Sequence, residues 1–357
     1  NKMNLESFVY QYQPNRVVFG YGAIQKLMEE IQKLGCSKAL ILCTPEQIGQ
    51  ARLVKDILGE NAVGVFDKAV MHVPVETARE ASKVANELGA DCAVAIGGGS
   101  TIGLGKAIAL EYSLPIIAIP TTYAGSEMTP IYGLTENNVK KTGKDFRVLP
   151  KTVIYDPELT LTLPLEVSLT SGMNAIAHAA EGLYAQDGNP IMTLFAEEGI
   201  RALAEGLKAL KANDQDKDAR SQCLYGAWLC GTVLGNVGMA LHHKLCHTLG
   251  GTFNLPHAPT HTVVLPQAIA YNEVARPEVT KIITRALKVE NVTAGQALFD
   301  LEQRLGLSTK LSDLNFTEAD IQKATDIAMS NPYWNPRPFG HENIQDILKK
   351  ACLGIRP

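Results

Sequence analysis

The stretch DCAVAIGGGSTIGLGKAIAL, residues 91–110, joins a run of apolar residues to four turn-forming residues and an Ala/Leu-rich segment. The first part is typical of a buried strand, and the last part is typical of a helix. Gly97, Gly98, Gly99 and Ser100 lie at the junction, where glycine lets the backbone approach a ligand closely. Free amides at a helix start favour phosphate. The stretch therefore predicts a strand, a phosphate-binding turn and a helix; a flexible turn without a ligand is the alternative.

This glycine turn differs from two common phosphate-binding motifs. No GxGxxG follows the strand, and GxxxxGK would need glycine where Ser100 stands. A second loop, IPTTYAGSEMTP at 119–130, follows another predicted strand and contains Thr121, Thr122 and Ser126. Two polar loops at the carboxyl ends of parallel strands indicate a nucleotide cleft.

Strand and helix patterns alternate over the first half of the chain. The segment PVETAREASKVANELG places apolar side chains three and four positions apart, as one face of a helix does. This alternation predicts a parallel sheet with helices on both faces, in a Rossmann-like dinucleotide-binding α/β domain. The predicted strands are RVVF from residue 16, then 38–43, 62–66, 91–100, 114–122 and 151–156.

The second half of the chain has a different pattern. After DPELTLTLP, which ends at Pro164, long Ala/Leu-rich segments replace the strands. A chain of 357 residues also exceeds the ~250 to 300 residues that one hydrophobic core supports. We therefore expect an α/β domain at 1–157 and an all-α catalytic domain at 158–357. The predicted helices lie near 166–186, 191–212, 217–249, 260–275, 278–289, 293–306, 317–330 and 341–352.

Composition narrows the class of function. Lys and Arg number 33 against 37 Asp and Glu, and no long basic run occurs, so we expect no nucleic-acid partner. The seven cysteines form no CxxC pair, which fits reduced thiols in the cytoplasm. No run of 18 apolar residues and no signal-peptide pattern occurs, so we expect no membrane partner and no export.

Five of the eight histidines lie in HHKLCHTLGGTFNLPHAPTH, residues 242–261. His243 and His247 are four residues apart on a predicted helix and share a face, while Pro256 makes His257 return on a turn. Asn174 has the same spacing to a further histidine on another helix. Such donors suit a metal ion, and they suit proton transfer without a metal equally well. His242 and His261 are expected to have packing or supporting roles.

Five motifs in this order resemble the iron-containing (group III) alcohol dehydrogenase family. They are the strand with GGGS, PTTYAGSE, DPELTLTLP, the helix SGMNAIAHAAE and HHKLCHTLGGTFNLPHA. The resemblance spans nearly the whole chain. It implies the fold of that family, which dehydroquinate synthase shares, with a dinucleotide-binding α/β domain and a C-terminal helical domain. It also implies a homodimer.

The resemblance implies roles for individual histidines. Metal-dependent members bind their ion with Asp, His, His and His, and these positions match Asn174, His178, His243 and His257. His247 matches a histidine near the nicotinamide.

Further implied roles concern the cofactor and an anionic substrate. Cofactor contacts carry over to the glycine turn, to the three hydroxyl residues of the second loop and, across NNVKKTGKD, to Lys140. Tyr123 lies where a substrate could touch it. Arg337 is a candidate cation for the substrate, and tying down its loop is the alternative. Thr44 ends the second strand in place of the acid that excludes a 2′-phosphate, so we expect use of NADH or NADPH.

Asn174 departs from the aspartate of the metal-dependent members. A neutral amide binds a divalent ion less strongly than a carboxylate, so we expect no tightly bound metal. Gly103 also replaces the aspartate of GGGSxxDxxK, and the second loop is one residue shorter than TTAGTGSE. These departures favour reductases of the family that act on the C=C bond of a small dicarboxylate in aromatic-compound catabolism. A metal-dependent alcohol dehydrogenase, a dehydroquinate synthase-like lyase and a non-catalytic NAD sensor are the alternatives.

The expected chemistry needs donors for a developing oxyanion. Hydride addition next to a carboxylate leaves an enolate, whose charge spreads onto a ketone oxygen. We expect His178, His243 and His257 to donate hydrogen bonds to that oxygen. His247 is the expected proton donor to the enolate carbon, because histidine titrates near neutral pH.

Overall fold

The computed structural model describes residues 7–11 and 15–357, which form two compact units. The α/β unit extends to Leu163, and the helical unit begins at Pro164 and includes residues 7–11. This division lies a few residues beyond the boundary predicted near residue 157. The short helix η6 (Pro157–Thr160) accounts for the difference, because its Leu159 belongs to the hydrophobic core of the α/β unit.

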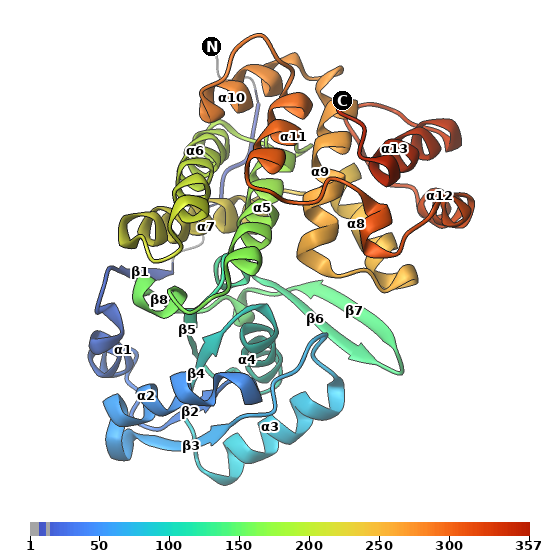
Figure 1. Cartoon of the computed structure of the whole chain (residues 1–357). Helices are drawn as coiled ribbons and strands as arrows, with labels where there is room; N and C mark the ends of the chain where they lie inside the picture. Colours follow the sequence, from blue (N-terminus) through green and yellow to red (C-terminus); the bar gives the residue numbers. More distant parts are fainter. Residues whose placement is uncertain (1–6, 12–14) are drawn as a thin grey trace. The chain divides into compact units, whose positions relative to one another are not determined.

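The α/β unit contains the six predicted strands and four α-helices between them (Figure 1). Its longer elements are β1 (Arg16–Phe19), α1 (Leu27–Lys33), β2 (Ala39–Leu42), α2 (Ile48–Leu58), β3 (Ala62–Phe66), α3 (Val75–Glu87), β4 (Cys92–Gly97), α4 (Gly99–Tyr112), β5 (Ile116–Pro120), β6 (Ile131–Glu136), β7 (Val139–Lys144) and β8 (Thr152–Tyr155). The 3-10 helices, besides η6, are η1 (Ala23–Lys26), η2 (Pro45–Gln47), η3 (Gly59–Asn61), η4 (Ser126–Met128) and η5 (Phe146–Val148).

The main sheet has six parallel strands in the order β1-β8-β5-β4-β2-β3. Side chains alternate between the two faces of the sheet. Ile41 and Val94 point to one face, where they share a core with α1 and α2. Leu42 and Ala95 point to the other face, next to Gly105 of α4. Helices therefore cover both faces, which confirms the predicted fold class. The chain turns outward in opposite directions from β2 and β4, which makes their carboxyl ends a topological switch point.

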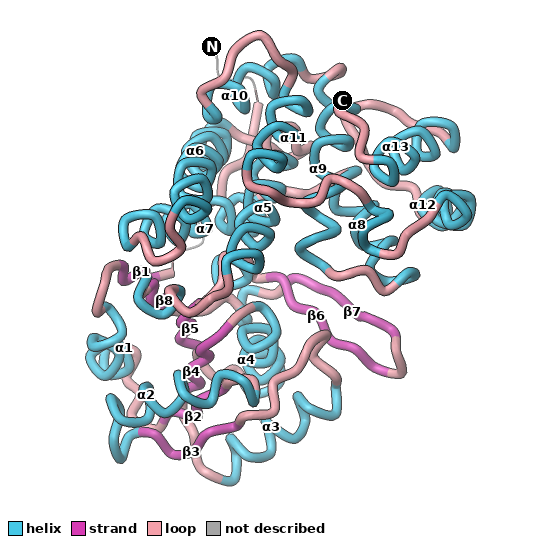
Figure 2. Tube along the Cα trace, viewed as in Figure 1, coloured by secondary structure: helices cyan, strands magenta, loops and turns pink. Residues whose placement is uncertain are grey.

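The antiparallel hairpin of β6 and β7 was not predicted (Figure 2). Its two-residue turn is Asn137-Asn138, and both residues have left-handed backbone angles, with φ values of 51° and 62°. Such a turn matches the twist of two antiparallel strands. The lysine-rich sequence after it hid the strand pattern, although the Asn-Asn pair is a recognisable turn signal.

The helical unit confirms the all-α prediction, since its described residues form helices and no strand. Its helices are α5 (Leu165–Gly182), α6 (Pro190–Ala212), α7 (Lys217–Asn236), α8 (Leu241–Phe253), α9 (His257–Glu273), α10 (Pro277–Leu287), α11 (Ala294–Arg304), η7 (Leu311–Leu314), η8 (Glu318–Asp320), α12 (Ile321–Ser330) and α13 (His341–Leu353). No single helix in the described ranges is long and apolar enough to span a membrane; α7 and α8, a bent pair, meet that test only together.

The prediction of one helix over 217–249 was wrong. Two helices, α7 and α8, meet there at 94°. Val237 adopts an extended conformation, and the amide of Gly238 donates a hydrogen bond to Asp187 (2.8 Å). The break sets where the histidine-bearing helix α8 begins.

Glycines allow α6 and α7 to pack closely beside the site helix α5. A Cβ on Gly226 of α7 would lie 2.7 Å from Leu203 Cγ and 3.1 Å from the backbone oxygen of Gly199. Backbone cannot move aside as a flexible side chain can. The spacing of these helices therefore depends on having no side chain at Gly226.

We predict that Gly226→Ala lowers the stability of the helical unit by about 1–3 kcal/mol, because the new methyl group overpacks the α6–α7 contact. Gly49→Ala on α2 is the control, since a Cβ there meets nothing within 4 Å. Thermal unfolding followed by circular dichroism measures both. Equal midpoints for Gly226→Ala and the parent would contradict the packing argument.

Candidate active site

The glycine turn follows β4, next to the switch point of the sheet. Gly97 has φ of 153°, and a Cβ there would lie 2.5 Å from Gln47 Oε1, so glycine alone fits. Gly99 begins α4, and a Cβ there would meet nothing within 4 Å. The buried hydroxyl of Thr101 on the same turn has no hydrogen-bond partner. Open space, helix amides and an unpaired hydroxyl together fit a phosphate group.

The structure joins three strand ends around this turn through Gln47, a residue that sequence analysis missed. Thr44 donates from its hydroxyl to Gln47 Oε1 (3.1 Å), and Gln47 Nε2 donates to Thr121 Oγ1 (3.1 Å). The Thr121 amide donates to the Gly97 carbonyl (3.0 Å). Thr122 packs against Gly98, whose added Cβ would lie 3.1 Å from Thr122 Cγ2. The candidate cofactor residues at the ends of β2, β4 and β5 therefore form one connected site.

Lys106, also missed as a site residue, holds the second loop to α4. Its buried ammonium donates to Ser126 O (2.7 Å), Ser126 Oγ (3.0 Å), Thr129 Oγ1 (2.9 Å) and Ile131 O (2.8 Å). Burial lowers the pKa of Lys106, and the Glu127 carboxylate partly opposes that shift. A lone lysine in an Ala/Leu-rich helix is the sequence signal for this role.

Two further expected contact residues, Lys140 and Tyr123, also belong to the α/β unit. Lys140 is exposed on the β6–β7 hairpin, paired in register with Thr135, and its side chain lies along Gly133. Tyr123 was expected to touch a substrate but is fully buried. Its contact with a substrate stays a prediction.

In the helical unit the structure brings His178 and His243 together. Both are buried, on α5 and α8 respectively, with His178 Nδ1 lying 2.9 Å from His243 Nε2. The other ring nitrogen of His243, Nδ1, lies 2.8 Å from Glu181 Oε1. Burial holds the pKa of His243 well below its usual range. His247 and His257 are exposed at the surface of the same unit.

His242 and His261 form a second buried pair, and their supporting role stays a prediction. His242 Nε2 lies 2.9 Å from His261 Nδ1, and the sulfur of Cys246 lies 3.7 Å from His242 Nε2. Burial lowers the pKa of both imidazoles. His261 Nε2 and His242 Nδ1 are buried without a hydrogen-bond partner.

The four positions that the family resemblance assigns to a metal do not fit one here. His243 Nε2 is already hydrogen-bonded to His178. Asn174 contributes a buried amide oxygen without a hydrogen-bond partner, in place of an anionic ligand. The replacement removes a negative charge that would strengthen the binding of a divalent ion.

The neighbouring group His242, Cys246 and His261 does not fit a metal better, although its candidate ligand atoms lie within 4.8 Å of one another. The outer ring nitrogens lack the acceptors that metal-bound histidines normally have.

Arg337 ties down its loop, which was the alternative to a substrate contact. Its guanidinium donates to the Tyr271 carbonyl (3.0 Å), and its Cζ lies 4.1 Å from the centre of the Tyr271 ring. Both interactions attach the loop at 331–338 to α9.

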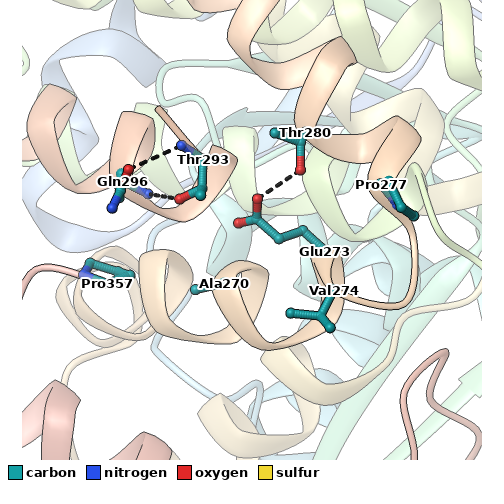
Figure 3. A pocket seen from close by; sticks show the side chains of 8 residues that line it. All are labelled: Ala270, Glu273, Val274, Pro277, Thr280, Thr293, Gln296 and Pro357. Carbon is teal, nitrogen blue, oxygen red and sulfur yellow. Dashed lines mark hydrogen bonds between the residues drawn. The ribbon is translucent and has the colours of Figure 1, made fainter. Parts of the chain in front are cut away.

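A pocket of about 370 Å³ lies in the helical unit beside α9, α10 and α11 (Figure 3). The carboxylate side chain of Glu273, which lines the pocket, accepts hydrogen bonds from Thr280 (2.7 Å) and from the amides of Ala294 (3.0 Å) and Gly295 (2.8 Å). Glu273 thus caps α11, and none of the candidate histidines lines this pocket.

Comparisons with known proteins agree with this arrangement. A family model described as iron-containing alcohol dehydrogenase matches residues 14–157, and a model of the C-terminal part of the Fe-containing alcohol dehydrogenase family matches residues 168–352. Maleylacetate reductase from Burkholderia cepacia is 59% identical over 353 residues, covering 99% of this chain and 100% of the relative.

Solved structures give the same result. Crystal structures of maleylacetate reductases from Agrobacterium tumefaciens and from Rhizobium sp. strain MTP-10005 are each 51% identical to this chain, with a TM-score of 0.96. Each comparison covers 99% of this chain and 100% of the other.

We predict that Gly99→Ala weakens NADH binding about tenfold, or ~1.4 kcal/mol, without lowering thermal stability. The added methyl group occupies space that is open in the protein and that a phosphate would fill. Gly97→Ala is the comparison, since its Cβ would meet Gln47 and should lower both properties. Fluorescence titration gives the affinity. Unchanged affinity in Gly99→Ala would mean that no phosphate approaches this turn.

Proposed function

The chain belongs to the iron-containing alcohol dehydrogenase family and is an oxidoreductase, and from this membership we propose that it reduces the C=C bond of maleylacetate to form 3-oxoadipate, in aromatic-compound catabolism. The observation that carries the proposal is the full-length identity of 59% to a maleylacetate reductase. The substitution of Asn174 for a metal-binding aspartate supports it, because alcohol oxidation calls for a Lewis acid more than enolate formation does. Family membership also confirms the resemblance expected from the sequence.

The α/β unit is the proposed site of NADH or NADPH. When bound, the reduced nicotinamide supplies a hydride to the substrate. The amides at Gly98, Gly99 and Ser100 hold the pyrophosphate, and Thr122 borders it. Thr44 carries no negative charge to repel a 2′-phosphate, which supports use of both cofactors.

The substrate explains why hydrogen bonds suffice in place of a metal. Hydride addition to the carbon next to the carboxylate moves the π electron pair of the C=C bond toward the ketone. The resulting enolate spreads its charge over a carbon and the ketone oxygen. A proton added to that carbon completes the saturated product. Donors placed at the oxygen stabilise this diffuse charge directly.

The histidines of the helical unit divide this work in our proposal. His178, with both ring nitrogens protonated, and His257 donate hydrogen bonds to the enolate oxygen, and His247 protonates the carbon, directly or through one water molecule. His243, which we expected to donate to the oxygen as well, has both ring nitrogens engaged within the helical unit. It therefore supports His178 and does not touch the substrate.

Three further expectations remain proposals. We propose that no tightly bound metal takes part, which the misfit of the Asn174 site supports. A homodimer is proposed from the family resemblance. A cytoplasmic location is proposed because all seven cysteines are unpaired and buried, as suits a reducing compartment.

We predict that the purified enzyme oxidises NADH in the presence of maleylacetate and keeps its activity after treatment with a strong chelator. Absorbance at the NADH band and metal analysis of the same sample measure this. Loss of activity on chelation that Fe²⁺ or Zn²⁺ restores would contradict the metal-free mechanism. Absence of any turnover with maleylacetate would contradict the proposed substrate.

We predict that His247→Gln lowers kcat about 10²- to 10⁴-fold, the range for loss of a general acid, because glutamine supplies no titratable proton. The control is His341→Gln, since His341 is exposed on α13 and lies 3.8 Å from Asp326. Steady-state kinetics with maleylacetate distinguishes them. Equal kcat values in both variants would show that another group protonates the enolate.

A further inference from the structure

Glu181 has no role in the chemistry described so far, yet it is fully buried beside the site histidines. Its Oε1 accepts hydrogen bonds from the backbone amides of Ala240 (2.9 Å) and His243 (3.0 Å), and the His243 ring nitrogen Nδ1 lies at 2.8 Å. Its Oε2 accepts from the His242 amide (3.1 Å) and from the Tyr184 hydroxyl. The carboxylate therefore connects α5 to the first turn of α8.

These partners require Glu181 to be ionised. Three of them are backbone amides, which can only donate. Tyr184 keeps its proton, because burial and the Glu181 carboxylate raise its pKa well above the usual range. A proton on either carboxyl oxygen would face a donor. The N-terminus of α8 adds a favourable dipole for an anion.

An ionised Glu181 determines which nitrogen of His243 carries hydrogen. A carboxylate only accepts, so His243 Nδ1 must donate to it. The neutral form of the ring has one N–H, and in that form the contact with Glu181 places it on Nδ1. His243 Nε2 is then an acceptor, and the hydrogen between the two rings comes from His178 Nδ1.

We propose that Glu181 is a positioning residue that holds His243 as the Nδ1–H tautomer and thereby gives the chain Glu181–His243–His178 a single hydrogen-bond direction. The effect on turnover rests on the proposed function, whereas the tautomer does not. With its Nδ1–H committed to His243, His178 accepts at Nε2 when its ring is neutral and donates from Nε2 only as an imidazolium. Glu181 thus determines which ring nitrogen of His178 shares its hydrogen with His243.

The same carboxylate explains why α7 and α8 are separate helices. Ala240 precedes α8 and has no side chain that can cap it, so the first amides of α8 depend on Glu181 and on Asn335, whose Oδ1 accepts from the Leu241 amide (3.3 Å). One group therefore sets both the start of α8 and the orientation of the His243 ring. If one helix continued from α7 through α8, these amides would donate to carbonyl groups of the preceding turn and would not be available to Glu181.

The tautomer can be measured directly in the whole enzyme. In protein labelled with ¹⁵N at histidine, we expect the His243 signals to show a protonated Nδ1 and an unprotonated Nε2; His243→Gln identifies them. A His243 ring protonated on Nε2 would overturn the proposal. If the expected tautomer is present but maleylacetate is not reduced, the proposed function fails and the positioning role stands.

Substitution then tests the link to catalysis. Glu181→Met removes both acceptors, so we expect mixed tautomers of His243 and a fall in kcat of about 10- to 100-fold, with little change in KM for NADH. Glu181→Gln should retain the Nδ1–H tautomer and restore part of kcat, because its carbonyl oxygen can take the Oε1 position where three N–H groups converge.

Glu273→Met is the matched control for a merely structural role. Glu273 is also buried and caps a helix through two amides, but its hydrogen bonds involve no histidine. We expect this variant to lose stability while the His243 signals and kcat stay at their parent values. A Glu181→Met enzyme with parent kcat would overturn the proposal. If that variant does not fold, Glu181→Gln with His243 protonated on Nε2 would overturn it equally.

Discussion

The buried carboxylate of Glu181 is the interaction on which the geometry of the helical unit depends. Burying a charge costs several kcal/mol unless hydrogen bonds replace the lost water, and five donors do so here. Three of those donors are the amides that start α8, and one is the ring of His243. Helix position and ring orientation are therefore tied to one group, which leaves the histidine pair little freedom to reorient.

The α/β unit uses a buried charge in the same way, with the opposite sign. Lys106 Nζ lies within hydrogen-bond distance of three oxygens in the loop that follows β5 and of one at the start of β6, and so attaches that loop to the helix that begins at the glycine turn. Gln47 adds neutral links between the ends of β2 and β5. In each unit one buried polar side chain, Lys106 or Glu181, holds a connecting segment in place. Each is shielded from water, so its hydrogen bonds must go to groups of the protein.

Local patterns predicted much of this protein. The six parallel strands and most helices followed from apolar periodicity, because the side chains that decide them are neighbours in the chain. The break between α7 and α8 did not, since NVGMA contains no proline and the groups that stabilise it, Asp187 and Glu181, lie more than 50 residues away. The β6–β7 hairpin was missed for a local reason, its lysine-rich strand, although its turn was visible.

The candidate site divides along the same line. The sequence by itself determined the fold class and the glycine turn, because residue type, spacing and family motifs are local properties. Only the tertiary structure decided that Tyr123 is buried, that Arg337 contacts α9 from its loop, that Lys106 holds a loop within the α/β unit, and that Glu181 holds His243 within the helical unit. These roles arise where distant segments exclude water, so that a polar group must find its partners in the protein. The spacing of residues along the chain does not show which polar groups become buried.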